Sequence, residues 1–186
     1  MIKIQIILGS TRPGRNGESV AKWAHQVAKT RKDIKVELVD LADYDLPLFD
    51  EPVSPMFAKE YTKPYTKKWS EKIAQADGYI FVTAEYNHSI PAALKNAIDC
   101  LYHEWGNKSA GFIGYGMAGG VRSIEHLRGV AGEVRMADVR ESLMLSLIHD
   151  FEQFSVFKPT DRHEAQLNKV LDQVASWAGV LQPLRS

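Results

Sequence analysis

Residues 78–101 read GYIFVTAEYNHSIPAALKNAIDCL, and this stretch decides the fold. Its first part, residues 78–83, is an almost uninterrupted apolar run, which is typical of a strand covered on both faces. Its last part has the spacing of one helical face, with Ser89 as a plausible cap and Pro91 in the first turn. The residues at that helical spacing are Leu94, Ala97, Ile98 and Leu101. A buried strand that leads directly into a helix is the repeating unit of a parallel α/β sheet.

The same alternation repeats along the chain. Further strands are expected at 2–8, 34–39 and 110–115, and helices at about 16–31, 69–76, 124–131 and 161–181. Two segments compete for the last strand, 133–139 and 142–148, and the pattern does not choose between them. Asp161 and Glu164 have the spacing of a capping box. The proline-rich segment 40–64 is expected to be mainly loop. We therefore predict one domain over residues 1–186, with a mostly parallel sheet and helices on both faces.

The composition excludes several classes of protein. The 186 residues hold 23 Lys and Arg against 23 Asp and Glu, so no net charge favours nucleic acid or an anionic membrane. The single cysteine, Cys100, cannot form an internal disulfide, which is typical of a reducing compartment. No apolar run approaches the ~20 residues of a membrane span, and residues 1–8 lack the pattern of a signal peptide. These features predict a cytoplasmic protein.

The first candidate loop, residues 9–17, reads GSTRPGRNG and joins a strand to a helix. Amides at a helix start, together with hydroxyls and two arginines, are suited to binding a phosphate. Gly9 and Gly14 have the spacing of a Walker A loop, but Arg15-Asn16 replaces its Lys-Ser/Thr pair, which disfavours an NTPase. A single terminal phosphate fits better, and the alternative is a flexible turn with exposed arginines.

Two further loops follow the third and fourth strands. Residues 84–91, AEYNHSIP, offer an aromatic ring, an amide and a hydroxyl that can stack on a flat ring and bond its edge. Residues 114–120, GYGMAGG, match the dinucleotide fingerprint GxGxxG, but that motif belongs in the first strand–helix turn. We interpret these glycines as room for close backbone approach to a planar ligand. A phosphate cup beside a ring platform makes FMN the leading candidate ligand.

Three stretches also resemble one family. They are GSTR at 9–12, EYNHSIP at 85–91 with LKNAID at 94–99, and the glycine-rich loop 116–120. Across nearly the whole chain, they are similar to the NADPH-dependent FMN reductases, flavodoxin-like flavoproteins that include quinone, azo-dye and chromate reductases. The resemblance implies a three-layer sandwich with a five-stranded parallel sheet in the order 2-1-3-4-5. It also implies bound FMN, NADPH or NADH as electron donor, and a homodimer or dimer-based tetramer.

The resemblance assigns roles by matching position. Ser10 and Arg12 would grip the FMN phosphate, and Arg15, Asn16 and Gly17 would close the cup. The isoalloxazine would be lined by Glu85, Tyr86, Asn87 and Ser89, and flanked by Gly116, Gly119 and Gly120. The chain departs from the family pattern at Ala84, where many relatives carry Pro, and at GRNG (14–17), which replaces a Ser/Asn-rich stretch.

These features predict an FMN-dependent NAD(P)H oxidoreductase. It would pass hydride from a nicotinamide through FMN to a small-molecule acceptor, a quinone or a similar flat or metal-oxyanion compound, by a ping-pong route. No metal site is expected, because HExxH and CxxC spacings are missing. No catalytic side chain is expected, because the flavin would carry the chemistry. The alternatives are a flavodoxin-type electron carrier, which the neutral charge disfavours, and a nucleotide-binding regulatory module without turnover. Trp105, just past a helix end, could reach the flavin pocket or a partner subunit.

Overall fold

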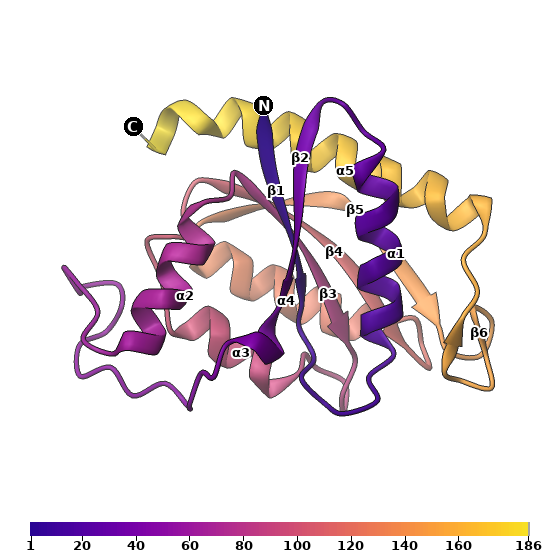
Figure 1. Ribbon diagram of the computed structural model, residues 1–186, viewed down its shortest axis with the longest axis horizontal. Coiled ribbons are helices and arrows are strands. Elements are labelled where there is room, and N and C mark those ends of the chain that lie inside the picture. The colour runs from indigo at the N-terminus through magenta and orange to yellow at the C-terminus, as the bar shows by residue number, and fades with distance from the viewer. Residues whose placement is uncertain (186) are drawn as a thin grey trace.

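Five parallel strands form the central sheet. They are β1 (Ile2–Leu8), β2 (Ile34–Asp40), β3 (Gly78–Ala84), β4 (Lys108–Gly116) and β5 (Met136–Ser146). In the computed structural model, which describes residues 1–185, the strand order is β2-β1-β3-β4-β5 (Figure 1). Every residue of β3 and β4 is buried, as their apolar runs require. The order confirms the flavodoxin-like sheet that the resemblance implies.

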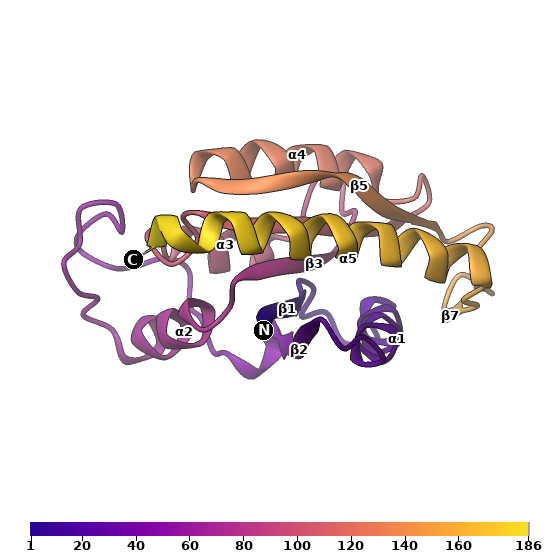
Figure 2. The same cartoon turned by 90° about the horizontal axis from the view of Figure 1, so that it is seen from above.

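Helices cover both faces of the sheet. α1 (Gly17–Lys29) and α5 (Asp161–Leu181) pack on one face, and α2 (Pro64–Ala74), α3 (Ala92–Asp99) and α4 (Val121–Glu133) pack on the other. α5 lies against β4 and β5 and runs the length of the molecule (Figure 2). The chain also holds a short hairpin, β6 (Phe151–Glu152) and β7 (Val156–Phe157), and the 3₁₀ turns η1 (Leu41–Asp43) and η2 (Gln182–Arg185). Apart from η1, the segment between Asp40 and Pro64 is loop, as expected.

The pairing of the last strand, β5, explains why the sequence pattern of this region is ambiguous. β5 runs through most of both candidate segments, and its register on β4 shifts in the middle. β4 advances from Ala110 to Phe112 while β5 advances from Asp138 to Ser142. The extra residues form a bulge, and a bulge changes which side chains face the core partway along a strand. A single alternating pattern therefore cannot describe the whole of β5.

Two predicted helix caps are wrong. Ser89 does not cap α3, which begins at Ala92 after Pro91 and has no side-chain cap. The Ser89 hydroxyl instead lies 3.0 Å from Nδ1 of His126. In α5 the capping box is formed by Thr160 and His163, one residue before the predicted pair. Thr160 takes the capping position because its backbone is extended. The acidic residues Asp161 and Glu164 lie in the first turn, where their negative charge interacts favourably with the helix dipole.

Trp105 is part of the core and reaches neither the flavin loops nor the surface. Its side chain is fully buried, packs against Trp69 and Tyr79, and donates from Nε1 to the Ile98 carbonyl at 3.1 Å. The chain turns back after α3, so a residue just beyond the helix still faces inward. Cys100 is also buried, and burial raises the pKa of its thiol to about 11. It fills the core as expected, rather than acting as a nucleophile.

Candidate functional site

The three candidate loops meet at one edge of the sheet. β1 pairs with β3, and β3 pairs with β4, so the loops at their carboxyl ends are neighbours. Two backbone bonds each tie the first residue of a loop to the neighbouring strand. The Gly9 amide donates to the Val82 carbonyl at 2.9 Å, and the Glu85 amide donates to the Tyr115 carbonyl at 3.0 Å. Ligands of open parallel sheets bind at this edge, where the strand order changes direction.

The two arginines of the first loop differ, because Arg12 has no partner in the described chain and Arg15 is bonded to other residues. Arg12 is exposed and makes no hydrogen bond or ion pair within residues 1–185. Arg15 is mostly buried, forms an ion pair with Asp40, and donates to the Ser10 carbonyl at 2.6 Å. Arg15 therefore holds the loop in shape against β2. Arg12 is the guanidinium that a bound phosphate can use.

The start of α1 lacks a side-chain cap. Asn16 occupies the capping position, but its side chain donates to the Phe154 carbonyl in the β6–β7 turn, at 2.7 Å. In the first turn, the Glu18 amide donates to the Arg15 carbonyl at 3.4 Å, and the Ser19 amide is left for another acceptor. Asn16 ties the cup to the hairpin, a role that the sequence did not indicate.

Ser10 connects the first loop to the second. Its side chain is fully buried, and its Oγ shares a 2.7 Å hydrogen bond with Oη of Tyr86. The two hydroxyls were predicted to serve different parts of FMN, the phosphate and the ring. In this structure they bind each other, so they fix the spacing between the two loops.

A residue that sequence analysis missed lies under the cup. Tyr115, at the end of β4, is buried, and its Oη has no hydrogen-bond partner within residues 1–185. Burial raises the pKa of this phenol to about 12, so it remains a hydrogen-bond donor. A Cβ on Gly17 would lie only 2.5 Å from this oxygen, so the glycine makes room for it. The sequence signal was slight, since Tyr115 stands inside a motif interpreted for its glycines.

The second loop is a two-residue turn. Tyr86 and Ser89 exchange backbone hydrogen bonds of 2.9 and 3.1 Å. Between them, Asn87 and His88 have φ angles of 51° and 68°, the left-handed pair typical of a type I′ turn. This geometry exposes both side chains at the edge of the site. Asn87 is therefore available to a ligand, as the resemblance implies.

Glu85 faces the protein and not an open platform. Its side chain is 5% exposed and forms an ion pair with Arg122, at the start of α4. One carboxylate oxygen accepts from the Arg122 amide at 3.1 Å, and the other accepts from Nε at 2.6 Å. Glu85 thus caps α4 and joins the second loop to the third. Arg122 was not predicted because nothing near it in the chain indicates a partner 37 residues away.

Replacing Glu85 by Gln is expected to lower the free energy of unfolding by about 1–3 kcal/mol, because a charge-assisted pair to a buried carboxylate is lost. Urea denaturation followed by tryptophan fluorescence measures the change. The matched control is Glu152→Gln, which breaks an ion pair to Lys158 whose two side chains are both 59% exposed. That control is expected to leave the free energy of unfolding almost unchanged, because solvent screens an exposed ion pair. Equal effects of the two variants would contradict the capping role of Glu85.

The glycines of the third loop allow the chain to approach itself. A Cβ on Gly116 would lie 3.1 Å from Cβ of Glu85, and one on Gly120 would lie 2.5 Å from the Tyr115 backbone nitrogen. Gly119 and Gly120 also have φ angles of 74° and 71°. These contacts are with the protein itself, with the Glu85 side chain at Gly116 and with the β4 backbone at Gly120, and approach to a planar ligand stays a prediction. The loop can thereby turn sharply into α4.

This arrangement fits FMN. An uncapped helix start, a free guanidinium and an orphaned buried hydroxyl are complementary to a phosphate. The exposed turn and the glycine-rich loop lie at the same sheet edge as the phosphate-binding loop. Within residues 1–185, no group of three or more His, Cys, Asp or Glu could hold a metal ion. No helix in the described part of the chain is long and apolar enough to cross a membrane.

Comparison with known proteins tests the cofactor that these residues indicate. Residues 2–150 match the model of the NADPH-dependent FMN reductase family. The chain is 46% identical to the NAD(P)H-dependent FMN reductase ntnL of Nectria sp over 128 residues, 66% of this chain and 64% of that protein. It is 38% identical to the NAD(P)H-dependent FMN reductase C4B3.06c of Schizosaccharomyces pombe, over 92% of this chain and 88% of that protein.

Two other similarities are more distant. A quinone reductase of Escherichia coli K12 is 36% identical over 68% of each chain. The flavoenzyme FerB, an NAD(P)H:(acceptor) oxidoreductase from Paracoccus denitrificans, has the same fold, with a TM-score of 0.73 at 20% identity over 96% of this chain and 98% of that one. The matched family model covers the β1 loop, the β3 loop and the β4 loop, which together form the site. The chain therefore belongs to the NADPH-dependent FMN reductase family of oxidoreductases.

Proposed function

We propose that this protein oxidises NADPH or NADH and reduces a quinone or a similar flat or metal-oxyanion acceptor, with FMN as its cofactor. The observation that carries the proposal is the meeting of the uncapped start of α1, the free Arg12 and the glycine-rich β4 loop at one sheet edge. Relatives named as NAD(P)H-dependent FMN reductases and as a quinone reductase support the choice of donor and acceptor.

Each loop has a separate task in the proposed enzyme. Bound FMN supplies the chemistry, acceptance of a hydride from the nicotinamide and its delivery to the acceptor. Arg12 and the open amide at the start of α1 would bind the phosphate, and the buried Tyr115 side chain lies directly beneath Gly17 and supports that helix start. The Glu85–Arg122 pair keeps the second and third loops at a fixed separation. No side chain is required as a nucleophile or general base.

A shared site predicts ping-pong kinetics. The three loops form one cradle, so donor and acceptor would occupy the same place in turn. Adding NADPH to the FMN-loaded protein without oxygen should bleach the flavin absorbance, and adding a benzoquinone should restore it. Initial rates at several fixed quinone concentrations should give parallel double-reciprocal lines, whereas intersecting lines would contradict a shared site. Flavin that stays bound but is not reduced by either nicotinamide would point to an electron carrier or a regulatory module instead.

The assembly and the location of the protein are also proposed from the family. We expect a homodimer or a dimer-based tetramer in the cytoplasm, with the flavin near the subunit interface. Sedimentation equilibrium of the FMN-loaded protein measures the mass directly. A monomer at micromolar concentration would contradict this assembly without affecting the proposed reaction.

A further inference from the structure

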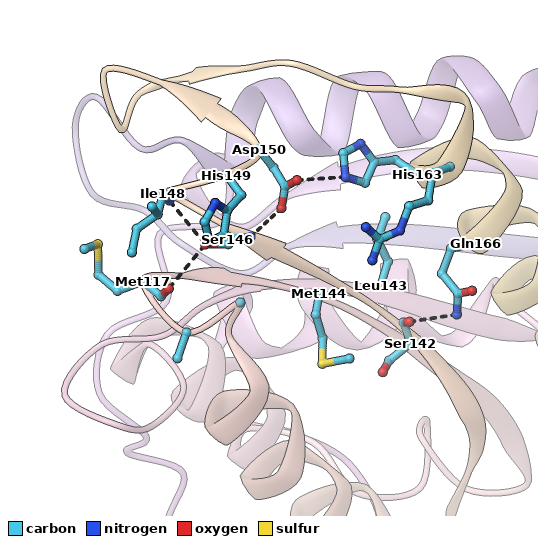
Figure 3. A pocket seen from close by; sticks show the side chains of 13 residues that line it. Met117, Ser142, Leu143, Met144, Ser146, Ile148, His149, Asp150, His163 and Gln166 are labelled. Atoms are coloured by element: carbon cyan, nitrogen blue, oxygen red, sulfur yellow. Dashed lines mark hydrogen bonds and ion pairs between the residues drawn. The ribbon is translucent and has the colours of Figure 1, made fainter.

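A second cavity lies beside the proposed flavin site. It has a volume of about 680 Å³ and opens between the edge strand β5 and α5 (Figure 3). Residues 117–119 of the β4 loop form part of its wall. A Cβ built on Gly116 would lie 3.1 Å from Cβ of Glu85, and one built on Gly119 would lie 3.3 Å from Cβ of Met144 in β5. The same loop therefore borders both the flavin platform and this cavity.

The cavity has an apolar side. Met117, Met144 and Ile148 line it, and each is more than half exposed, at 57%, 51% and 53%. They come from the β4 loop, from β5 and from the turn after β5, and they surround one opening (Figure 3). Flexible methionines and an isoleucine make an adaptable surface for a flat heterocycle.

The unpaired charge in the cavity is positive. Asp150 is already engaged, because it accepts from the Ser146 amide at 2.7 Å and contacts Nε2 of His163 at 3.1 Å (Figure 3). Arg162, in the first turn of α5, makes no hydrogen bond or ion pair with any other part of residues 1–185. The His149 ring also has no partner in the described chain, and it is exposed. An anionic group can therefore bind Arg162 without displacing an internal partner.

We propose that this cavity holds the adenosine end of the nicotinamide donor, and that Arg162 pairs with the 2′-phosphate that distinguishes NADPH from NADH. The proposal rests on the proposed function, because it concerns the donor of that reaction. This donor combines a flat heterocycle with phosphates, which match the apolar side and the free guanidinium. An arginine binds a phosphate with two parallel hydrogen bonds, so it is well suited to recognising this group. The nicotinamide would lie on the flavin side of the β4 loop.

The test compares Arg162→Ala with Arg140→Ala in the FMN-loaded protein. Arg140 is a suitable control because its side chain is 89% exposed on β5 and lies outside the cavity. Calorimetry measures the binding of adenosine 2′,5′-bisphosphate and of 5′-AMP, and steady-state assays measure KM for NADPH and NADH. Arg162→Ala should weaken bisphosphate binding and raise the NADPH KM, each about tenfold, with little change for 5′-AMP and NADH. Arg140→Ala should change none of these.

The two assays separate failure of this proposal from failure of the proposed function. If the wild-type protein turns over NADPH but Arg162→Ala changes neither bisphosphate binding nor the NADPH KM, the cavity assignment is wrong and the function stands. Equal losses for NADPH and NADH would also overturn the recognition of the 2′-phosphate. If the bisphosphate binds through Arg162 but neither nicotinamide is oxidised, the cavity is a nucleotide site and the proposed function is wrong.

Discussion

Replacing Gly120 by Ala is expected to lower the free energy of unfolding by about 2–5 kcal/mol and to reduce FMN retention. Gly120 has a φ of 71°, a left-handed conformation that costs alanine about 1–2 kcal/mol. The added Cβ would also lie 2.5 Å from the Tyr115 nitrogen and 2.7 Å from the Gly114 carbonyl carbon. Because both atoms belong to the backbone of β4, the β4 loop itself must move. Urea denaturation and the flavin content after gel filtration measure the two effects.

Gly132→Ala is the matched control. Gly132 lies in α4, the helix that begins directly after Gly120, and nothing lies within 4 Å of a Cβ built on it. With no clash and no left-handed φ, alanine is expected to raise the free energy of unfolding by about 0.5–1 kcal/mol. FMN content should be unchanged. A Gly120→Ala protein as stable as wild type would show that the β4 loop can relax, and would remove the argument for its rigidity.

Replacing Arg12 by Ala is expected to raise the dissociation constant of FMN about tenfold to a hundredfold, which corresponds to about 1.5–3 kcal/mol of charge-assisted hydrogen bonding. Arg12 is exposed and has no partner within residues 1–185, so the substitution should leave the free energy of unfolding of the apoprotein unchanged. Quenching of flavin fluorescence on titration with the apoprotein measures the affinity.

Riboflavin is the control ligand, since it has the ring of FMN without the phosphate. Its affinity should be the same for wild type and Arg12→Ala. Equal losses for riboflavin and FMN would show that Arg12 does not act on the phosphate. Arg15→Ala should behave differently, because it removes the ion pair to Asp40 and the bond to the Ser10 carbonyl. It is expected to lower the free energy of unfolding of the apoprotein as well as its affinity for FMN.

Much of the fold could be predicted because its signals are local. The run at 78–83 is apolar on both sides, and that pattern is compatible with the centre of a covered sheet. Strand–helix alternation then requires right-handed crossovers, which bring the carboxyl ends of the strands to one edge. For this reason the sequence located the three loops of the site. The β5 bulge could not be found in this way, because it depends on pairing with β4.

The residue types of the site follow from the sequence, but their partners follow from the tertiary structure. Glu85 was expected to face the ring, and it caps α4 through Arg122, 37 residues away. Arg12 and Arg15 look equivalent in the sequence. In the structure, Asp40 at the end of β2 forms an ion pair with Arg15 and leaves Arg12 unpaired. By itself, the sequence determined an α/β sheet with three candidate loops at one edge, and it predicted a phosphate cup and a ring platform there. The tertiary structure decided which side chains remain free for a ligand, because hydrogen bonds and ion pairs form between groups that are distant in the chain and depend on distances of a few ångströms.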